Sequence, residues 1–226
     1  MRHDYTVRNP VKLLAPAQRP RADVKEAAYF ENSELPRLFP ELPSGLVRMF
    51  CELALKTGMR QGELVGLQWG EVDLLTGTVR VRRSITGGEL GTPKNHERRD
   101  VDVTADAVDL LGQWWSAVGS PDASDAWVFP GVARRGVVSP PTVVGHLYEA
   151  MERAGVPRIG PTGEKRTFHS FRHTFAKVAL ERGTQITWLS RHLGHSSLKV
   201  TTDIYGHWER EERKRQAAKL EGAFSL

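Results

Sequence analysis

The chain has 226 residues, a formal net charge of +5 and a single cysteine, Cys51. Its hydrophobic fraction of 39% and charged fraction of 26% are ordinary for a folded globular protein and argue against disorder. No apolar run reaches the roughly 18 to 20 residues that a transmembrane helix requires, and the polar N-terminus lacks the apolar segment of a signal peptide. We therefore expect a cytoplasmic protein with one main domain and no internal disulfide or cysteine-based zinc site.

Residues 1–28 combine basic side chains with three prolines and show no sustained hydrophobic periodicity. This composition predicts a basic linker or arm, and we place the main domain at 29–226. Helical periodicity begins after Ser33, a candidate N-cap, and resumes after Ser44 in a second helix that we expect to end at Gly58. A short helix is expected from Gly62 to Trp69.

From Val72 the hydrophobic period changes to two, which is typical of strands, with a turn at Thr76-Gly77. Another strand follows Gly87-Gly88, and the alternation returns over 99–103. We therefore predict a small antiparallel three-stranded sheet. Basic residues gather in this region, and we expect them on one face of the sheet, where they would contact DNA phosphates: Arg80, Arg82, Arg83, Lys94, Arg98 and Arg99.

The remainder of the chain is predominantly helical in its periodicity. Helices are predicted from Thr104, from the Ser139-Pro140-Pro141 entry to about residue 154, and at about 169–182, 185–193, 197–204 and 208–220. Glycines at 183, 194 and 206 separate the last four. The fold class is therefore α+β and mainly helical, with the small sheet as its β component.

The chemically informative segments are T-G-M-R-Q-G-E-L at 57–64, H-S-F-R-H at 169–173, L-G-H-S-S at 193–197 and T-T-D-I-Y at 201–205. On a helix, His169 and Arg172 are three residues apart and share a face, so both can reach one target. A phosphate suits that target, because a guanidinium offers a rigid fork of donors that matches phosphate oxygens.

These four segments, in this order, resemble the signature of the tyrosine recombinases of the phage integrase family, and the resemblance covers about residues 28–220. It implies the mainly helical catalytic fold of that family. It also implies that Arg60 and Arg172 clamp the scissile phosphate, and that His169 and His195 are the imidazoles beside it. One of these histidines would assist proton removal from the nucleophile and the other would donate to a phosphate oxygen.

The resemblance further implies that Tyr205 is the nucleophile, which would form a 3′-phosphotyrosyl bond with DNA. Lys94, in G-T-P-K-N at 91–95, resembles the lysine that protonates the departing 5′ oxygen. We assign Glu63 and His173 supporting roles, with Glu63 orienting the turn that carries Arg60. No metal or other cofactor is expected, since Arg, His and Lys side chains supply the charge stabilisation.

The implied function is site-specific recombination, which integrates or excises a prophage or mobile element by cutting and rejoining double-stranded DNA. Relatives act as four protomers on synapsed DNA, so we expect a homotetramer there, a monomer when free, and an accessory directionality factor. Two alternatives stay open at this point. One is relaxation of supercoils in the manner of a type IB topoisomerase, and the other is a non-catalytic DNA-binding fragment.

Overall fold

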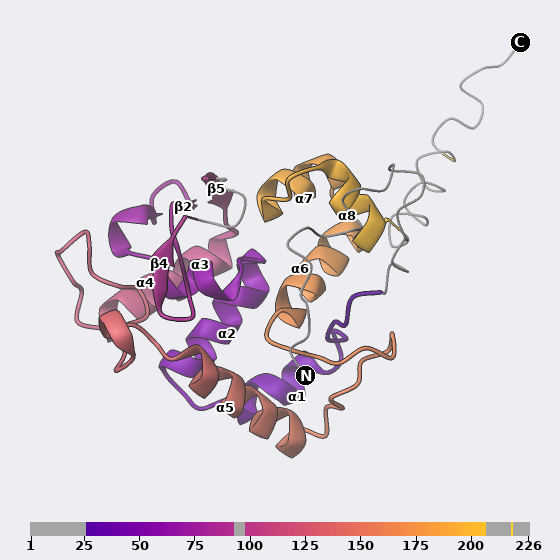
Figure 1. Ribbon diagram of the computed structural model, residues 1–226, viewed down its shortest axis with the longest axis horizontal. Helices are drawn as coiled ribbons and strands as arrows, with labels where there is room; N and C mark the ends of the chain where they lie inside the picture. Colours follow the sequence, from indigo (N-terminus) through magenta and orange to yellow (C-terminus); the bar gives the residue numbers. More distant parts are fainter. Residues whose placement is uncertain (1–25, 93–97, 207–217, 219–226) are drawn as a thin grey trace, which may run out of the picture.

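The computed structural model describes residues 26–92, 98–206 and 218. Figure 1 shows two groups of helices. The first surrounds the larger core and contains α1 (Leu35–Glu41), α2 (Leu46–Thr57), α4 (Ala105–Ala117) and α5 (Pro140–Arg153). The second contains α6 (Ser170–Glu181), α7 (Ile186–Leu193) and α8 (Leu198–Tyr205). Among the described helices, none is both long and apolar enough to cross a membrane. The predicted helix at 208–220 lies almost wholly outside the described residues.

The end of α2 is fixed by Gly58, as the sequence predicts. Gly58 has φ +63°, in the left-handed region that closes a helix, and its backbone N–H donates to the carbonyl of Ala54. A β-carbon at this position would lie 2.7 Å from the ring of Phe175 on α6. Both the conformation and the close approach of α6 therefore require glycine. They also bring Arg60 close to the second helical group.

The three-stranded antiparallel sheet is confirmed, with the order β1 (Val72–Asp73), β2 (Thr78–Val81) and β5 (Arg99–Asp102). Thr76-Gly77 forms the turn between its first two strands, as predicted. The strand that contains Ile85, β3 (Ser84–Thr86), does not join this sheet. It pairs with β4 (Glu89–Gly91) in a separate two-stranded hairpin, beside α3 (Gln61–Val65).

The register of β2 and β5 corrects the expectation that the basic residues share one face. Arg80 lies opposite Asp100, whereas Arg99 lies opposite Val81, which is buried. Since successive side chains point to opposite faces of a strand, Arg99 is on the core side of the sheet with Val81. The prediction of a shared basic face is therefore wrong for Arg99.

Two apolar clusters hold the fold together. The larger is built around Phe50, Leu53, Phe129 and Phe171, and it includes residues of α1, α2, α4, α5, α6 and the sheet. The smaller lies within the second helical group and consists of buried residues on α6, α7 and α8: Ala176, Leu180, Leu189, Leu193 and Tyr205. Tyr205 is thus held by core packing, which restricts the position of its hydroxyl.

Candidate active site

Two arginines from distant parts of the chain meet at the turn that ends α7. Arg60 Nη2 donates to the carbonyl of Gly194 at 2.8 Å, and Arg172 Nη2 donates to the carbonyl of Leu193 at 2.6 Å. Arg172 Nη1 also donates to the carbonyl of Gly58 at 2.8 Å. A guanidinium has five N–H donors, so each arginine retains donors that could bind a phosphate oxygen beside this turn.

The carboxylate of Glu63 connects this arginine pair to the sheet. It accepts hydrogen bonds from Arg60 through both the backbone N–H and Nη1, each at 2.9 Å. It also accepts a bidentate pair from Arg99, at 2.9 and 2.8 Å. Burial acts to raise the pKa of Glu63, but the hydrogen bonds and charge of Arg99, with those of Arg60, lower it to about 2. Glu63 is therefore ionised at neutral pH and fixes two guanidinium groups.

Tyr205 lies within hydrogen-bonding distance of an imidazole on α6. The distance from His173 Nδ1 to Tyr205 Oη is 2.7 Å, and Tyr205 is only 1% exposed. His195, in the turn between α7 and α8, has its ring nearly parallel to that of Tyr205, with centroids 6.1 Å apart. Its Nδ1 lies 2.8 Å from the hydroxyl oxygen of Thr201. The nucleophile expected from the sequence thus sits between two histidines.

His169 occupies the N-cap of α6 and is exposed, one helical turn from His173. The two rings meet edge to face, with centroids 4.7 Å apart. The structure therefore brings together five of the six predicted catalytic residues. The sixth, Lys94, lies outside the described residues.

Burial controls the ionisation of these groups. It lowers the pKa of Arg172 to about 9, which still leaves the guanidinium charged at neutral pH. Burial, together with nearby positive groups that include Arg172, lowers the pKa of His173 and of His195 to about 3, so both imidazoles are neutral at pH 7. Burial raises the pKa of Tyr205 to about 12, against the opposing charges of Arg172 and Arg60. The tyrosine is therefore protonated at rest.

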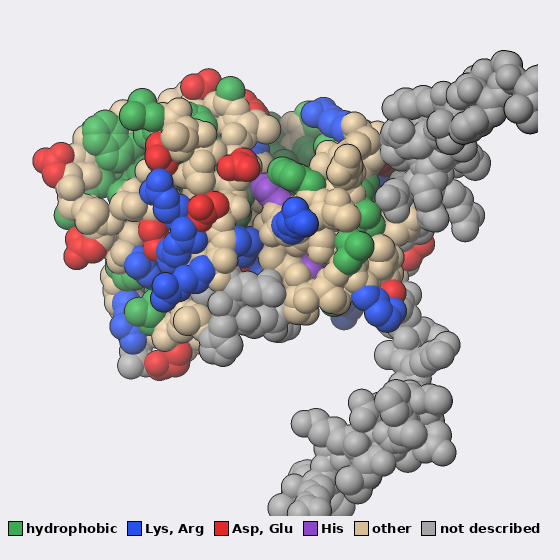
Figure 2. All heavy atoms as spheres, turned by 90° about the horizontal axis from the view of Figure 1, so that it is seen from above, with side chains coloured by type: hydrophobic (Ala, Val, Ile, Leu, Met, Phe, Trp, Pro, Cys, Tyr) green, Lys and Arg blue, Asp and Glu red, His purple; other side chains and the backbone are tan. Residues whose placement is uncertain are grey.

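Figure 2 shows Lys and Arg side chains gathered on one face, with acidic side chains among them and histidine exposed nearby. Three of the predicted DNA-binding arginines pair with acids: Arg80 with Asp73, Arg82 with Asp100 and Arg83 with Glu71. Arg98 is exposed next to β5. Arg99 pairs instead with the buried Glu63 and does not share this face.

Sequence reasoning did not identify the structural roles of Arg99 and His192. Arg99 Nε donates to the carbonyl of His192 at 2.8 Å, and His192 Nε2 lies 2.9 Å from the carbonyl oxygen of Thr57. Both residues therefore connect α7 to the segment that carries Arg60. The alternation of β5 with its buried Val101 could have placed Arg99 on the core face, but no sequence signal identified its partners.

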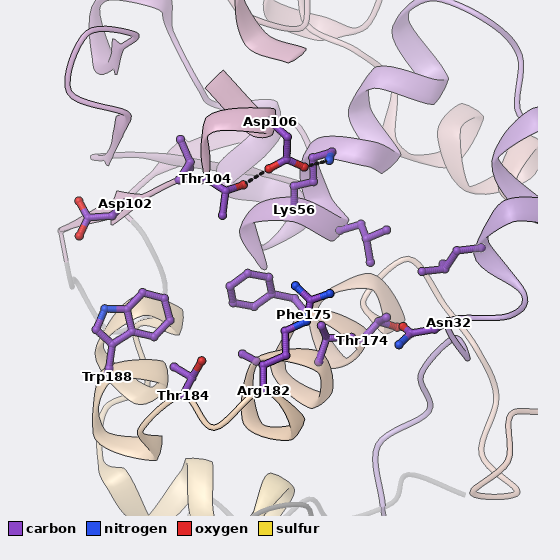
Figure 3. Close-up of a pocket in the computed structure, with 15 residues that line it drawn as sticks. Asn32, Lys56, Asp102, Thr104, Asp106, Thr174, Phe175, Arg182, Thr184 and Trp188 are labelled. Carbon is purple, nitrogen blue, oxygen red and sulfur yellow. Dashed lines mark hydrogen bonds and ion pairs between the residues drawn. The ribbon is translucent and has the colours of Figure 1, made fainter. Parts of the chain in front are cut away.

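Figure 3 shows a cavity of about 600 Å³ between the two helical groups. Trp188 and Phe175 line one side of the cavity, and Lys56, Thr104 and Asp106 line the other. The lining does not include Arg60, Arg172 or Tyr205. Within the described residues, no cluster of three His, Cys, Asp or Glu side chains is arranged to hold a metal ion.

A helical domain that combines an arginine pair with histidines and a tyrosine in this arrangement defines the class of the tyrosine recombinases. The sequence pattern of the phage integrase family matches residues 30–212. The chain belongs to the phage integrase family.

Curated relatives and solved structures agree with this assignment. A tyrosine recombinase XerC-like protein of Caldanaerobacter subterraneus subsp. tengcongensis is 26% identical over 90% of this chain and 57% of its own length. The tyrosine recombinase XerC of Xylella fastidiosa is 32% identical over 74% of this chain and 50% of its own length. The crystal structure of XerA recombinase superposes with a TM-score of 0.63 and 26% identity, covering 87% of this chain and 66% of that one. The chain thus spans between half and three fifths of these curated relatives.

Proposed function

We propose that this chain carries out site-specific DNA recombination, of the kind that integrates or excises a prophage or mobile element. The observation that supports it is the convergence of Arg60 and Arg172 on one turn, beside a buried Tyr205 that is hydrogen-bonded to an imidazole. A positively charged pair next to a hydroxyl nucleophile suits attack on a phosphodiester. Among its relatives are the prophage integrase IntR of Escherichia coli and the ICEBs1 integrase of Bacillus subtilis.

In the proposed reaction the two guanidinium groups hold the non-bridging oxygens of the scissile phosphate and stabilise the charge that develops in the transition state. Tyr205 attacks phosphorus, and a 3′-phosphotyrosyl bond replaces the bond to the 5′ oxygen. Lys94 would protonate that departing oxygen. His169 and His195 would stand beside the phosphate, with Glu63 and His173 in the supporting roles predicted from the sequence. The phosphotyrosyl bond conserves the phosphodiester energy, so rejoining needs no nucleotide cofactor.

The proposed partner is double-stranded DNA, bound by Arg80, Arg82, Arg83 and Arg98 on the basic face. Solved recombinases of the same fold include a XerH recombinase bound to its difH substrate, which supports this partner. We further propose a monomer that assembles into a homotetramer on synapsed DNA, with an accessory directionality factor, acting in the cytoplasm. Residues 1–28 would form the basic arm that precedes the catalytic domain at 29–226.

The test uses a pool of nicked, partly randomised DNA duplexes incubated with the protein or with Tyr205→Phe. After quenching with SDS, protein-linked DNA is recovered and sequenced. An adduct that requires Tyr205 supports the proposal and reports the preferred site. Strand exchange between two such sites then distinguishes recombination from supercoil relaxation alone. DNA binding without any adduct would contradict the proposal and favour a binding fragment.

A further inference from the structure

We propose that His173 is a catalytic residue of this chain, which accepts the proton of the Tyr205 hydroxyl as that oxygen attacks phosphorus. The inference rests on the proposed function. It differs from the assignment that the sequence implies, in which His169 or His195 assists the nucleophile and His173 only supports the site. The difference arises from the hydrogen bond that the structure places between His173 and the Tyr205 hydroxyl.

The hydrogen bond of 2.7 Å joins His173 Nδ1 directly to the reacting oxygen of Tyr205. General-base catalysis requires this contact, since a base must lie within about 2.6 to 3.2 Å of the atom that it deprotonates. His195 directs its Nδ1 to the hydroxyl of Thr201 instead, at 2.8 Å. His169 is exposed at the start of α6, with its ring against the ring of His173. His173 therefore has the geometry for proton transfer in the structure as it stands.

The contact between His173 and Tyr205 is held by the packing of its two helices. Tyr205 ends α8 and packs into the apolar cluster that also contains Ala176 and Leu180 of α6. Arg172 immediately precedes His173 on α6, and its guanidinium is fixed by the carbonyls of Gly58 and Leu193. Adjacent residues of one helix thus hold the phosphate-binding guanidinium and the hydroxyl nucleophile. This arrangement presets the distance between the two reactants.

The protonation states leave His173 in the form that can accept a proton. Burial lowers the pKa of His173 to about 3, and so does the repulsion that its protonated ring would meet from His169 and Arg172 on α6 and from His195. The imidazole is therefore neutral at pH 7, and Nδ1 can accept the tyrosine proton when Nε2 carries the ring hydrogen. Because burial raises the pKa of Tyr205 to about 12, free phenolate is scarce. The proton must move as the bond to phosphorus forms, when the phenolic oxygen loses its basicity.

The step balances in protons and bonds. The Tyr205 proton passes from Oη to His173 Nδ1, the bond from Oη to phosphorus forms, and the bond from phosphorus to the 5′ oxygen breaks. That oxygen takes up a proton, for which Lys94 is the proposed donor. In the rejoining step the His173 imidazolium returns its proton to Tyr205 as the phosphotyrosyl bond breaks. The same residue thereby acts as base in cleavage and as acid in ligation.

The decisive variant is His173→Asn, because its amide oxygen can replace Nδ1 as an acceptor but cannot take the proton at neutral pH. We expect cleavage of the selected nicked site to slow by about 10² to 10⁴-fold, the usual contribution of a general base. His146→Asn, which removes a partly exposed histidine of α5, is the control and should react at the wild-type rate. Thermal unfolding by circular dichroism verifies that each variant is folded.

A second substrate distinguishes a general-base role of His173 from a general-acid role. In a 5′-bridging phosphorothiolate the leaving group is a thiolate, which departs without a proton. The defect of His173→Asn should persist on this substrate, because the Tyr205 proton must still be removed when the leaving group needs none. A cleavage rate for His173→Asn close to that of the wild type, or full rescue by the sulfur substrate, would overturn the inference.

A measurement without DNA keeps this inference distinguishable from the proposed function. Nitrogen NMR of labelled histidine should show His173 as the tautomer with hydrogen on Nε2, with an Nδ1 resonance that shifts in Tyr205→Phe. If the wild type shows this shift but forms no adduct, the proposed function is wrong. The proton transfer is then wrong as well, although the hydrogen bond between His173 and Tyr205 is present. If the wild type forms adducts and the resonance does not respond to Tyr205→Phe, the inference alone is wrong.

Discussion

The carboxylate of Glu63 binds the guanidinium of Arg99 through two hydrogen bonds, at 2.9 and 2.8 Å, with the glutamate side chain fully buried. Glu63 follows Arg60 by three residues, whereas Arg99 comes from the sheet. The same carboxylate also binds Arg60. One buried anion therefore sets the positions of a guanidinium proposed to bind phosphate and of one that connects the sheet to α7.

We predict that Glu63→Gln destabilises the protein by about 3 to 5 kcal/mol, the usual cost of removing one partner of a buried ion pair. The variant leaves the Arg99 guanidinium buried without its counter-ion. Urea denaturation measures the change in the free energy of unfolding. Glu41→Gln is the matched control, because its pair with Arg153 is solvent-exposed. We expect the control to lose at most about 1 kcal/mol. Equal losses in the two variants would contradict the structural role of Glu63.

Gly58→Ala should be strongly destabilising, because it combines two costs. The left-handed conformation costs an L-residue about 1 to 2 kcal/mol, and the new methyl group would meet Phe175 at 2.7 Å. Gly155→Ala separates these costs, since Gly155 has φ +64° but open space around it. We expect thermal unfolding to rank the stabilities as wild type, Gly155→Ala and then Gly58→Ala. Similar values for the two variants would indicate that α6 does not pack tightly on this turn.

The free energy of unfolding should decrease as the pH is lowered below about 6.5, partly because of His192. Burial lowers the pKa of His192 to about 4, with Arg99 and Arg172 adding to the decrease and the Thr57 carbonyl opposing it. The unfolded chain therefore binds a proton at this site below its ordinary pKa of 6.5, while the folded chain does not until about pH 4. Stability is full above pH 6.5 and is lost as the pH falls through this window.

His192→Gln isolates that contribution, because its amide can still donate to the carbonyl of Thr57. Unfolding free energies measured from pH 7 to pH 4 should decrease less steeply in the variant, by up to about 1.4 kcal/mol per pH unit. Other titrating groups, including Glu63, contribute equally to both proteins. Parallel curves would show that His192 does not stay neutral in the folded state.

The basic face should determine the salt dependence of DNA binding. Arg80→Gln and Arg98→Gln should each reduce the slope of log affinity against log salt by about 0.9, if each arginine contacts one phosphate. Arg37→Gln on α1 makes the same change in net charge at another exposed site and should leave the slope unchanged. Titration of a fluorescent duplex at several salt concentrations measures the slopes. A uniform effect of all three substitutions would indicate a general charge effect.

Much of this protein could be predicted from local sequence patterns. The bounds of α2, α5, α6, α7 and α8, the Gly58 terminus and the turn at Thr76-Gly77 follow from periodicity and glycine conformation, which depend on neighbouring residues. The short helix expected from Gly62 to Trp69 is instead α3, Gln61–Val65. The residues proposed to react, including Arg60 and Tyr205, could also be identified from their segments. These features are local, so the sequence alone determined them.

The tertiary structure decided which side chains meet. Arg99 looked like one more member of a basic cluster, but the register of β5 turns it towards buried Glu63. His173 looked like a supporting residue, but the apolar cluster shared by α6, α7 and α8 brings its Nδ1 to Tyr205. Such contacts depend on strand register and on the relative orientation of helices. Register and helix orientation are set by the burial of whole apolar faces, and a single motif does not determine them.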